Sequence, residues 1–225
     1  NRTFGIISHV VYGLTFPQNF IPDLIVVGIG YPLKGIEDWG AGRHSHLSPS
    51  YDSSRSESWR KYLEAMSGRK DLDVRSGQAD SFLLFIQKEL IPYMEKEYRA
   101  SKEKRGIAGY SLGGLFTMYA LLNAPGTFEY YFAGSPSLWW GNDIIFVIEE
   151  EFARTHDNLD ARLYMSVGEL ENAGMIEDMK RMEYILQERN YPDLKFKTKI
   201  FPYEIHQTCY PAALTRSLMF LYGED

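Results

Sequence analysis

A continuous apolar run rich in β-branched residues stands out in this chain of 225 residues. It is Leu-Ile-Val-Val-Gly-Ile-Gly at 24–30, which has no polar interruption and ends in glycines. Such runs are typical of strands that are buried on both faces of a parallel sheet. The predicted strands are 24–30, 105–109, 129–134, 162–168 and 195–201.

Between these runs, apolar residues recur every three or four positions, which is the spacing of one helix face. Residues 80–98 follow this pattern, and Pro92 predicts a kink within them. Strands that alternate with helices indicate a mostly parallel sheet with helices on both faces. Because no repeat or low-complexity linker divides the chain, we expect a single α/β domain over residues 1–225. The other predicted helices are 112–123, 174–189 and 211–222.

Residues 31–76 depart from both patterns. They are rich in glycine, serine, proline and charge, and only 56–67 has a helical pattern. A long irregular segment inside a compact domain is usually functional or disordered. This one follows the predicted strand 24–30 at its carboxyl end, the edge where open parallel sheets bind ligands. We therefore expect 31–76 to form a lid-like wall of a binding site.

A Gly-x-Ser-x-Gly motif lies at 109–113 and has Ser111 at its centre. A predicted strand precedes it and the predicted helix 112–123 follows it, which is the context of a nucleophile elbow. In that turn the serine takes a strained conformation that pushes Oγ towards substrate, and the flanking glycines avoid Cβ clashes. The alternative is a glycine-rich turn without chemistry. The strand-turn-helix context favours Ser111 as a nucleophile.

A serine hydroxyl needs a base, and the base needs an orienting acid. In folds with this elbow the order along the chain is serine, acid, histidine. Of the five histidines only His206 follows a late strand and precedes the last helix, so we expect it to be the base. The predicted strand 162–168 is followed by Glu169 and Glu171, and either could be the acid. We prefer Glu171, because more of the loop is available to bring it near His206.

The negative oxygen that forms during acyl transfer needs two backbone N–H donors, which together form an oxyanion hole. Leu112, directly after the nucleophile, is expected to supply the first. Tyr31, in the turn after the predicted strand 24–30, is expected to supply the second, since Pro32 has no N–H.

Three further side chains are candidates for contacts with substrate. Trp139 and Trp140 follow the predicted strand 129–134 at the same edge, where they form either an aromatic wall or core packing. Arg43 lies in the irregular segment and pairs either with an anionic substrate group or with a surface carboxylate. His44 and His46 form a His-x-His pattern there. No cysteine or acidic partner accompanies it, so we predict no metal site.

Composition and charge narrow the classes of function. Hydrophobic residues make up 44% of the chain, which suffices for the core of one α/β domain. The net charge is −6 and no run of lysine or arginine occurs, which argues against a nucleic-acid partner. No apolar run approaches the roughly 18 residues of a membrane span. Cys209 is the only cysteine, which excludes an intrachain disulfide and is compatible with cytoplasm and periplasm alike.

Several motifs together resemble the family called "Putative esterase" among the α/β-hydrolases. The family includes siderophore, feruloyl and acetyl-xylan esterases, S-formylglutathione hydrolases and mycolyltransferases. The sequence Ile-Val-Val-Gly-Ile-Gly-Tyr at 25–31 is most similar to the siderophore-esterase branch. The stretches that carry the resemblance are Ser81-Phe-Leu-Leu-Phe-Ile-Gln-Lys-Glu-Leu-Ile-Pro-Tyr, Ile107-Ala-Gly-Tyr-Ser-Leu-Gly-Gly-Leu-Phe and Phe132-Ala-Gly-Ser-Pro-Ser-Leu-Trp-Trp.

This resemblance implies an α/β-hydrolase catalytic domain with a lid-like segment. It implies Ser111 as nucleophile, Glu171 as acid, and His206 as base within Phe201-Pro-Tyr-Glu-Ile-His. Members of the family have strands before the first helix, whereas this chain begins near that helix, at about Phe4. We therefore expect a sheet that lacks those strands and has an exposed edge prone to self-association.

Together these residues predict a serine carboxylic-ester hydrolase that works on a small-molecule ester through an acyl-enzyme, without cofactor or metal. Two alternatives stand beside it. One is acyl transfer to a carbohydrate or lipid alcohol, and the other is an inactive hydrolase fold used for binding. The candidate contact residues fit aryl, sugar and short acyl esters alike.

Overall fold

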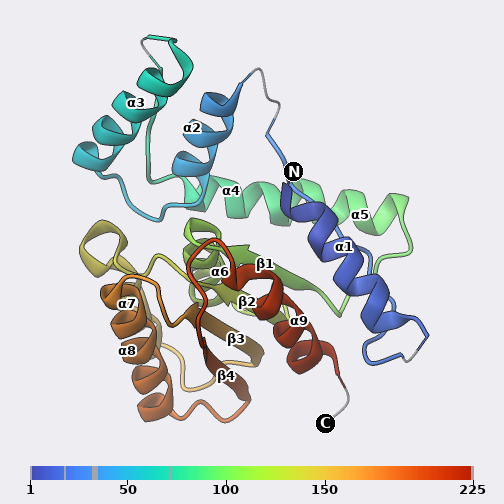
Figure 1. The fold of residues 1–225 in the computed structure, drawn as a ribbon. Coiled ribbons are helices and arrows are strands. Elements are labelled where there is room, and N and C mark those ends of the chain that lie inside the picture. Colours follow the sequence, from blue (N-terminus) through green and yellow to red (C-terminus); the bar gives the residue numbers. More distant parts are fainter. Residues whose placement is uncertain (1, 18, 32–34, 71, 224–225) are drawn as a thin grey trace.

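The computed structural model describes residues 2–17, 19–31, 35–70 and 72–223. Its centre is a parallel sheet with strand order β1-β2-β3-β4 (Figure 1). Four of the five predicted strands are confirmed, each with its ends within one residue of the prediction. The strands are β1 (Gly106–Tyr110), β2 (Tyr130–Gly134), β3 (Ala161–Gly168) and β4 (Leu194–Phe201).

Helices cover both faces of this sheet, as predicted. One core cluster joins α4, α6, α7 and α8 to one face, and a second joins α1 and α9 to the other. Neighbouring strand residues supply the two clusters, because successive side chains of a strand point to opposite faces. Tyr131 thus faces the first cluster and Tyr130 the second. The α-helices of the described chain are α1 (Arg2–Thr15), α2 (Ile36–His46), α3 (Ser53–Ser67), α4 (Ala79–Phe85), α5 (Ile91–Glu97), α6 (Leu112–Asn123), α7 (Trp140–Ala153), α8 (Ala173–Arg189) and α9 (Cys209–Tyr222).

The prediction of a strand at 24–30 is wrong. Leu24 and Val26 pack against the cluster of α1 and α9, whereas Ile25 and Val27 are 50% and 44% exposed. The run is therefore buried on one side only. An apolar run becomes a strand where a neighbouring strand supplies hydrogen-bond partners. No described residue pairs with 24–30 in a sheet.

Residues 79–97 form one long helical segment, close to the predicted helix 80–98. It consists of α4, a π-helical turn η1 (Ile86–Leu90) and α5. Pro92, at the start of α5, has no N–H to give to the preceding turn, and the helix widens there. The irregularity predicted at the proline thus lies just before it in the chain.

The segment 31–76, called the lid segment below, is more regular than predicted. It contains α2, which the sequence pattern does not reveal, and α3, which begins before the predicted helix 56–67. Asp52 caps α3, because its side chain accepts a hydrogen bond from the N–H of Arg55 at 2.9 Å. Figure 1 shows α2 and α3 side by side outside the sheet, with α2 next to α4.

All four strands run in the same direction, so the loops that follow them leave from one edge of the sheet. These loops begin after Tyr110, Gly134, Gly168 and Phe201. Ser111, Glu171 and His206 lie in three of these loops and are therefore gathered at this edge.

Candidate active site

Ser111 occupies a sharp turn between β1 and α6. Its backbone has φ 62° and ψ −119°, a conformation that residues with a side chain rarely adopt. Two backbone hydrogen bonds hold the turn. The N–H of Ser111 donates to the carbonyl of Gly134 at 2.9 Å, and the N–H of Ser137 donates to the carbonyl of Ser111 at 3.2 Å. The end of β2 thus maintains the strained conformation that a nucleophile elbow requires.

The glycines around the elbow differ in their steric roles. A Cβ on Gly109 would lie 1.9 Å from the carbonyl oxygen of Gly113, and a Cβ on Gly114 would lie 2.8 Å from that of Gly134. A Cβ on Gly113 would meet only Nη1 of Arg43, at 4.0 Å. Packing therefore requires the first glycine of the motif and leaves room at the second.

We expect Gly109→Ala to lower the free energy of unfolding by about 3 kcal/mol or more, since its methyl group would overlap a backbone oxygen of α6. The midpoint of thermal unfolding, followed by circular dichroism, should fall by about 10 °C. Gly113→Ala is the matched control and should melt at or above the wild-type temperature, because alanine favours a helix. Equal melting temperatures for the two variants would contradict this account of the elbow.

His206 and Glu171 are in direct contact. Nδ1 of His206 lies 2.6 Å from Oε2 of Glu171, whose side chain is fully buried, while a third of the His206 side chain is exposed. The other candidate, Glu169, turns away and accepts a hydrogen bond from the N–H of Tyr203 at 3.0 Å. Of the two glutamates, the geometry therefore brings Glu171 to the histidine.

Burial alone would raise the pKa of Glu171, because it penalises the charged form. Hydrogen bonds from His206, Ser135 and the N–H of Gly168 outweigh burial and hold the pKa of this carboxyl below its ordinary value. Glu171 is thus an acceptor at neutral pH, and Nδ1 of His206 must carry the hydrogen between them. The other ring nitrogen, Nε2, is then left with its lone pair for proton transfer.

His206 is linked to the elbow through Tyr110, the residue before the nucleophile. The two ring centroids are 5.1 Å apart, and the Tyr110 hydroxyl donates to the carbonyl oxygen of His206 at 2.8 Å. Oγ of Ser111 and Nε2 of His206 form no hydrogen bond with any described residue. Catalytic hydrogen bonds are often long without substrate and tighten when it binds.

The two residues predicted for the oxyanion hole lie in different settings. Leu112 is the first residue of α6, so its N–H has no acceptor within the helix, and a helix N-terminus favours negative charge. The ring of Tyr31 stacks on His46 of α2 with 5.6 Å between centroids. The ring of Tyr31 therefore packs against α2, within the lid segment. Pro32 lies outside the described residues.

Comparison with known proteins places the chain in a family. Residues 47–216 match the family model described as "Putative esterase". The chain belongs to this family. It is 28% identical over 232 residues to ferri-bacillibactin esterase BesA of Bacillus subtilis, covering 100% of this chain and 77% of that protein. It is 31% identical over 156 residues to the siderophore triacetylfusarinine C esterase of Aspergillus fumigatus, covering 69% of this chain and 47% of that protein.

Solved structures share the architecture of this esterase. The BES protein from Bacillus cereus superposes with a TM-score of 0.82 at 27% identity, over 99% of this chain and 81% of that one. An IroE-like serine hydrolase from Shewanella oneidensis has a TM-score of 0.79 at 24% identity, over 98% of this chain and 67% of that one. At this identity the similarity supports a shared fold and nothing more. The predicted α/β-hydrolase fold, the family and the assignment as an esterase are thus confirmed.

Arg43 of α2 places a positive charge beside the elbow of the esterase. Its Nη2 donates to the carbonyl of Tyr110 at 2.8 Å, and its guanidinium lies 5.6 Å from the ring centroid of Trp39. Burial lowers the pKa of Arg43 and Tyr31 opposes this shift, yet a guanidinium stays charged at physiological pH. No carboxylate of the described residues pairs with Arg43. Its charge is therefore uncompensated next to Ser111.

The two predicted tryptophans have different surroundings. Trp140 is 2% exposed, and its Nε1 donates to the carbonyl of Ser50 in the lid segment at 3.3 Å. It therefore acts as core packing beneath the lid segment. Trp139 is partly exposed, and the guanidinium of Arg55 lies 4.3 Å from its ring centroid. Of the pair, Trp139 is the more exposed.

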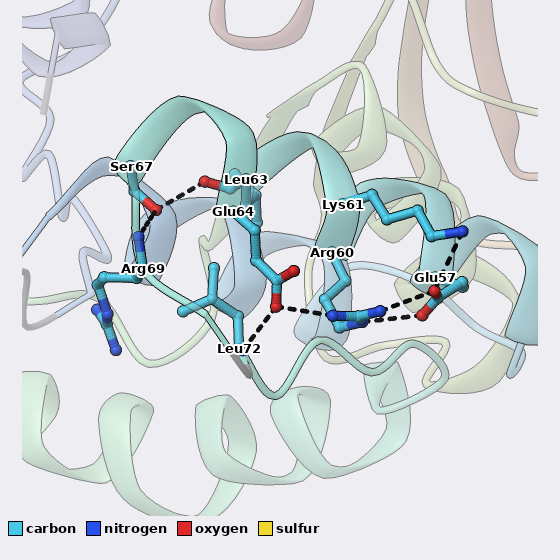
Figure 2. Close-up of polar contacts among 8 residues, drawn as sticks. All are labelled: Glu57, Arg60, Lys61, Leu63, Glu64, Ser67, Arg69 and Leu72. Atoms are coloured by element: carbon cyan, nitrogen blue, oxygen red, sulfur yellow. Dashed lines mark hydrogen bonds and ion pairs between the residues drawn. The ribbon is translucent and has the colours of Figure 1, made fainter.

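The lid segment is held together by polar contacts along α3, shown in Figure 2. Arg60 bonds both oxygens of Glu57, at 2.7 and 2.8 Å, and Oε1 of Glu64 at 2.7 Å. Oε1 of Glu64 also accepts from the N–H of Leu72 at 3.1 Å. Exposed ion pairs contribute little individually, but this set ties α3 to the chain that follows it.

The lid segment also has a small core, formed by Leu63, Leu72 and Val74. Arg69, beyond the end of α3, pairs with Glu37 in the first turn of α2 at 2.8 Å. Packing and charge thus join α2 to α3 and make the lid segment a unit with its own interior. Its two histidines are part of that unit: burial lowers the pKa of His44 to about 4, so this ring is neutral and packs between Trp59 and Trp140.

No metal-binding group of three or more histidine, cysteine, aspartate or glutamate residues occurs in the described part of the chain. A separate finding concerns membranes: among the described helices, none combines the length and apolar character of a membrane span.

Sequence reasoning did not identify two polar residues at this edge. Ser135 Oγ lies 2.6 Å from Oε1 of Glu171 and 2.7 Å from the hydroxyl of Tyr110. Their positions in the sequence indicated that they lie near the site, since Ser135 follows β2 directly and Tyr110 precedes the nucleophile. Only the folded arrangement reveals that Ser135 contacts the acid and that Tyr110 contacts the backbone of the base.

Proposed function

We propose that this esterase hydrolyses carboxylic esters through an acyl-enzyme formed on Ser111. The observation that carries the proposal is the 2.6 Å contact between His206 Nδ1 and the ionised Glu171, at the sheet edge where Ser111 stands on a strained elbow. This contact orients the imidazole and stabilises the positive charge that it gains during reaction.

The reaction has two halves. Nε2 of His206 takes the hydroxyl proton of Ser111 as Oγ attacks the ester carbonyl, and the N–H groups of Leu112 and Tyr31 bind the oxygen that becomes negative. The protonated His206 then gives its proton to the leaving alcohol, and the acyl group stays on Ser111. In the second half His206 activates a water molecule, which releases the acid and restores the serine.

We propose further that the substrate is an ester-linked siderophore. BesA of Bacillus subtilis is named a ferri-bacillibactin esterase, and the relative from Aspergillus fumigatus is named a siderophore triacetylfusarinine C esterase. The site supports the same class here, because Arg43 presents an uncompensated positive charge beside the elbow, and iron chelates of this kind are rich in negative oxygens. Trp139 and the lid segment would form the wall of the binding site, and the buried Trp140 packs against Trp139, with 6.0 Å between the ring centroids.

The experiment that tests this proposal compares two substrates, a ferric trilactone siderophore and neutral p-nitrophenyl acetate. For Arg43→Met we expect KM for the ferric siderophore to rise about 10- to 100-fold, the range for losing a hydrogen bond to a charged group. Turnover of p-nitrophenyl acetate should change far less and serves as the control. Product analysis by mass spectrometry, with added glycerol as an alternative acceptor, separates hydrolysis from acyl transfer.

Turnover of p-nitrophenyl acetate without turnover of any siderophore ester would reject the substrate and retain the esterase. An equal loss of activity of Arg43→Met on both substrates would show that Arg43 supports the elbow instead of binding an anion.

A further inference from the structure

The loop after β2 holds Ser135 in an unusual conformation. Its φ is 39°, in the left-handed region that residues with a side chain rarely occupy, and its side chain is completely buried. The N–H of Ser135 donates to the carbonyl of Ser166 in β3 at 2.7 Å. A strained, buried polar residue needs a compensating interaction. Here the hydroxyl provides it, since Oγ lies 2.6 Å from Oε1 of Glu171.

Tyr110 extends this contact to the base. Its hydroxyl lies 2.7 Å from Oγ of Ser135 and donates to the backbone carbonyl of His206 at 2.8 Å. Ser135 and Tyr110 therefore connect the carboxylate of Glu171 to the backbone of His206, in addition to the direct contact between the side chains of those two residues. Each strand end contributes one member: Tyr110 comes from β1, and the other three follow β2, β3 and β4.

The number of hydrogens decides how these contacts are shared. The two hydroxyls carry one hydrogen each, whereas the ionised Glu171 and the carbonyl of His206 can only accept. The hydrogen of Tyr110 goes to the carbonyl of His206. The single hydrogen of Ser135 is shared between Glu171 and the Tyr110 hydroxyl, and the bond to the charged acceptor is the stronger one. Tyr110 thus couples the loop that carries the base to the group that holds the acid.

We propose that Ser135 and Tyr110 are positioning residues of this esterase, which fix Glu171 and the His206 loop relative to each other. The proposal rests on the triad of the proposed function, because Ser135 acts only through Glu171. Oε2 of Glu171 serves His206, while Oε1 is occupied by Ser135 and the N–H of Gly168. With both oxygens engaged, the carboxylate cannot rotate away from the imidazole.

The test is a double-mutant cycle between Ser135→Ala and Glu171→Ala, read as the rate at which a fluorophosphonate labels Ser111 and as kcat and KM on p-nitrophenyl acetate. Ser135→Ala in the wild-type background should lower the labelling rate and kcat about 10-fold and leave KM unchanged. In the Glu171→Ala background the same change should alter the rate by less than about 2-fold, because its target is gone.

Tyr110→Phe removes only a hydroxyl and gives a second, nearly isosteric variant. We expect it to lower kcat about 2- to 10-fold, the range for one neutral hydrogen bond, again without a change in KM. Ser217→Ala and Tyr222→Phe are the matched controls. Ser217 is a buried serine bonded within α9, and the Tyr222 hydroxyl lies by Gly106 at the opposite end of β1. Both controls should keep wild-type rates.

Three results would overturn the proposal. The first is an equal loss from Ser135→Ala in both backgrounds, which would mean that Ser135 supports the fold and not Glu171. The second is full activity of Ser135→Ala and Tyr110→Phe. The third is full activity of Glu171→Ala alone, which would also remove Glu171 from the triad. Only the third result counts against the proposed function. Failure of the positioning role can therefore be distinguished from failure of the proposed function.

Discussion

Replacing Ser111 with alanine should lower kcat for p-nitrophenyl esters by at least about 10⁴-fold, since loss of the nucleophile in a serine hydrolase removes the covalent pathway. The substitution deletes one oxygen at a site where the backbone strain is held by Gly134 and Ser137, so the fold should persist. The measurement is steady-state hydrolysis of a series from acetate to octanoate, whose chain-length profile in the wild type also gauges the acyl pocket.

The control for this variant is labelling by a fluorophosphonate, which reacts with activated serines. Wild-type protein should be labelled on Ser111 and Ser111→Ala should not. Wild-type protein that folds, fails to react and hydrolyses nothing would match the inactive binding module considered in the sequence analysis. Turnover by Ser111→Ala at the wild-type rate would reject the acyl-enzyme.

Replacing His206 with alanine is expected to have an effect of similar size, about 10⁴-fold or more in kcat, because no base remains to take the serine proton. The variant leaves a space beside Glu171, into which imidazole can diffuse. Added imidazole should therefore restore part of the activity, with a saturable dependence on its concentration. Rescue would identify the loss as one of proton transfer.

The matched control is His156→Ala, an exposed histidine between α7 and the start of β3, whereas the proposed site residues follow the other ends of the strands. It should hydrolyse esters at the wild-type rate with or without imidazole. A loss in His206→Ala that imidazole cannot relieve, together with a lowered melting temperature, would point to a structural role.

Most of the sheet was predictable because the sequence signals of its strands lie within short stretches of the chain. β1 to β4 are short segments between turn signals, and the helices that alternate with them predict a parallel sheet covered on both faces. The run at 24–30 looks the same in the sequence, yet it forms no strand, because pairing depends on a neighbour that local sequence does not specify.

Helix α2 was missed for a related reason. It contains two glycines and shows no apolar stripe, so neither propensity nor pattern favours it. The structure stabilises it from a distance: Arg69 pairs with Glu37 in its first turn. In α7 the helical run is preceded by Gly141, Asn142 and Asp143, all with positive φ, which conceals where the helix begins.

At the site, the sequence order of serine, acid and histidine was enough to nominate Ser111 and His206. It could only rank Glu171 above Glu169, because two residues of loop decide which carboxylate faces inwards. The positions of Ser135 and Tyr110 in the sequence place them near the site, but their roles depend on loops from different strands that meet only in the folded chain.

The order of segments along the chain also bears on how such enzymes diversify. The residues proposed for proton transfer and covalent chemistry all follow position 110, whereas the lid segment ends at position 76 and has its own small core. Recombination could exchange that one contiguous stretch, with Arg43 inside it, and leave Ser111, Glu171 and His206 untouched, provided that the new stretch supplies an N–H where Tyr31 now lies. New ester specificities would then arise by replacing one continuous coding segment. The new lid segment would also have to pack against Trp139 and Trp140.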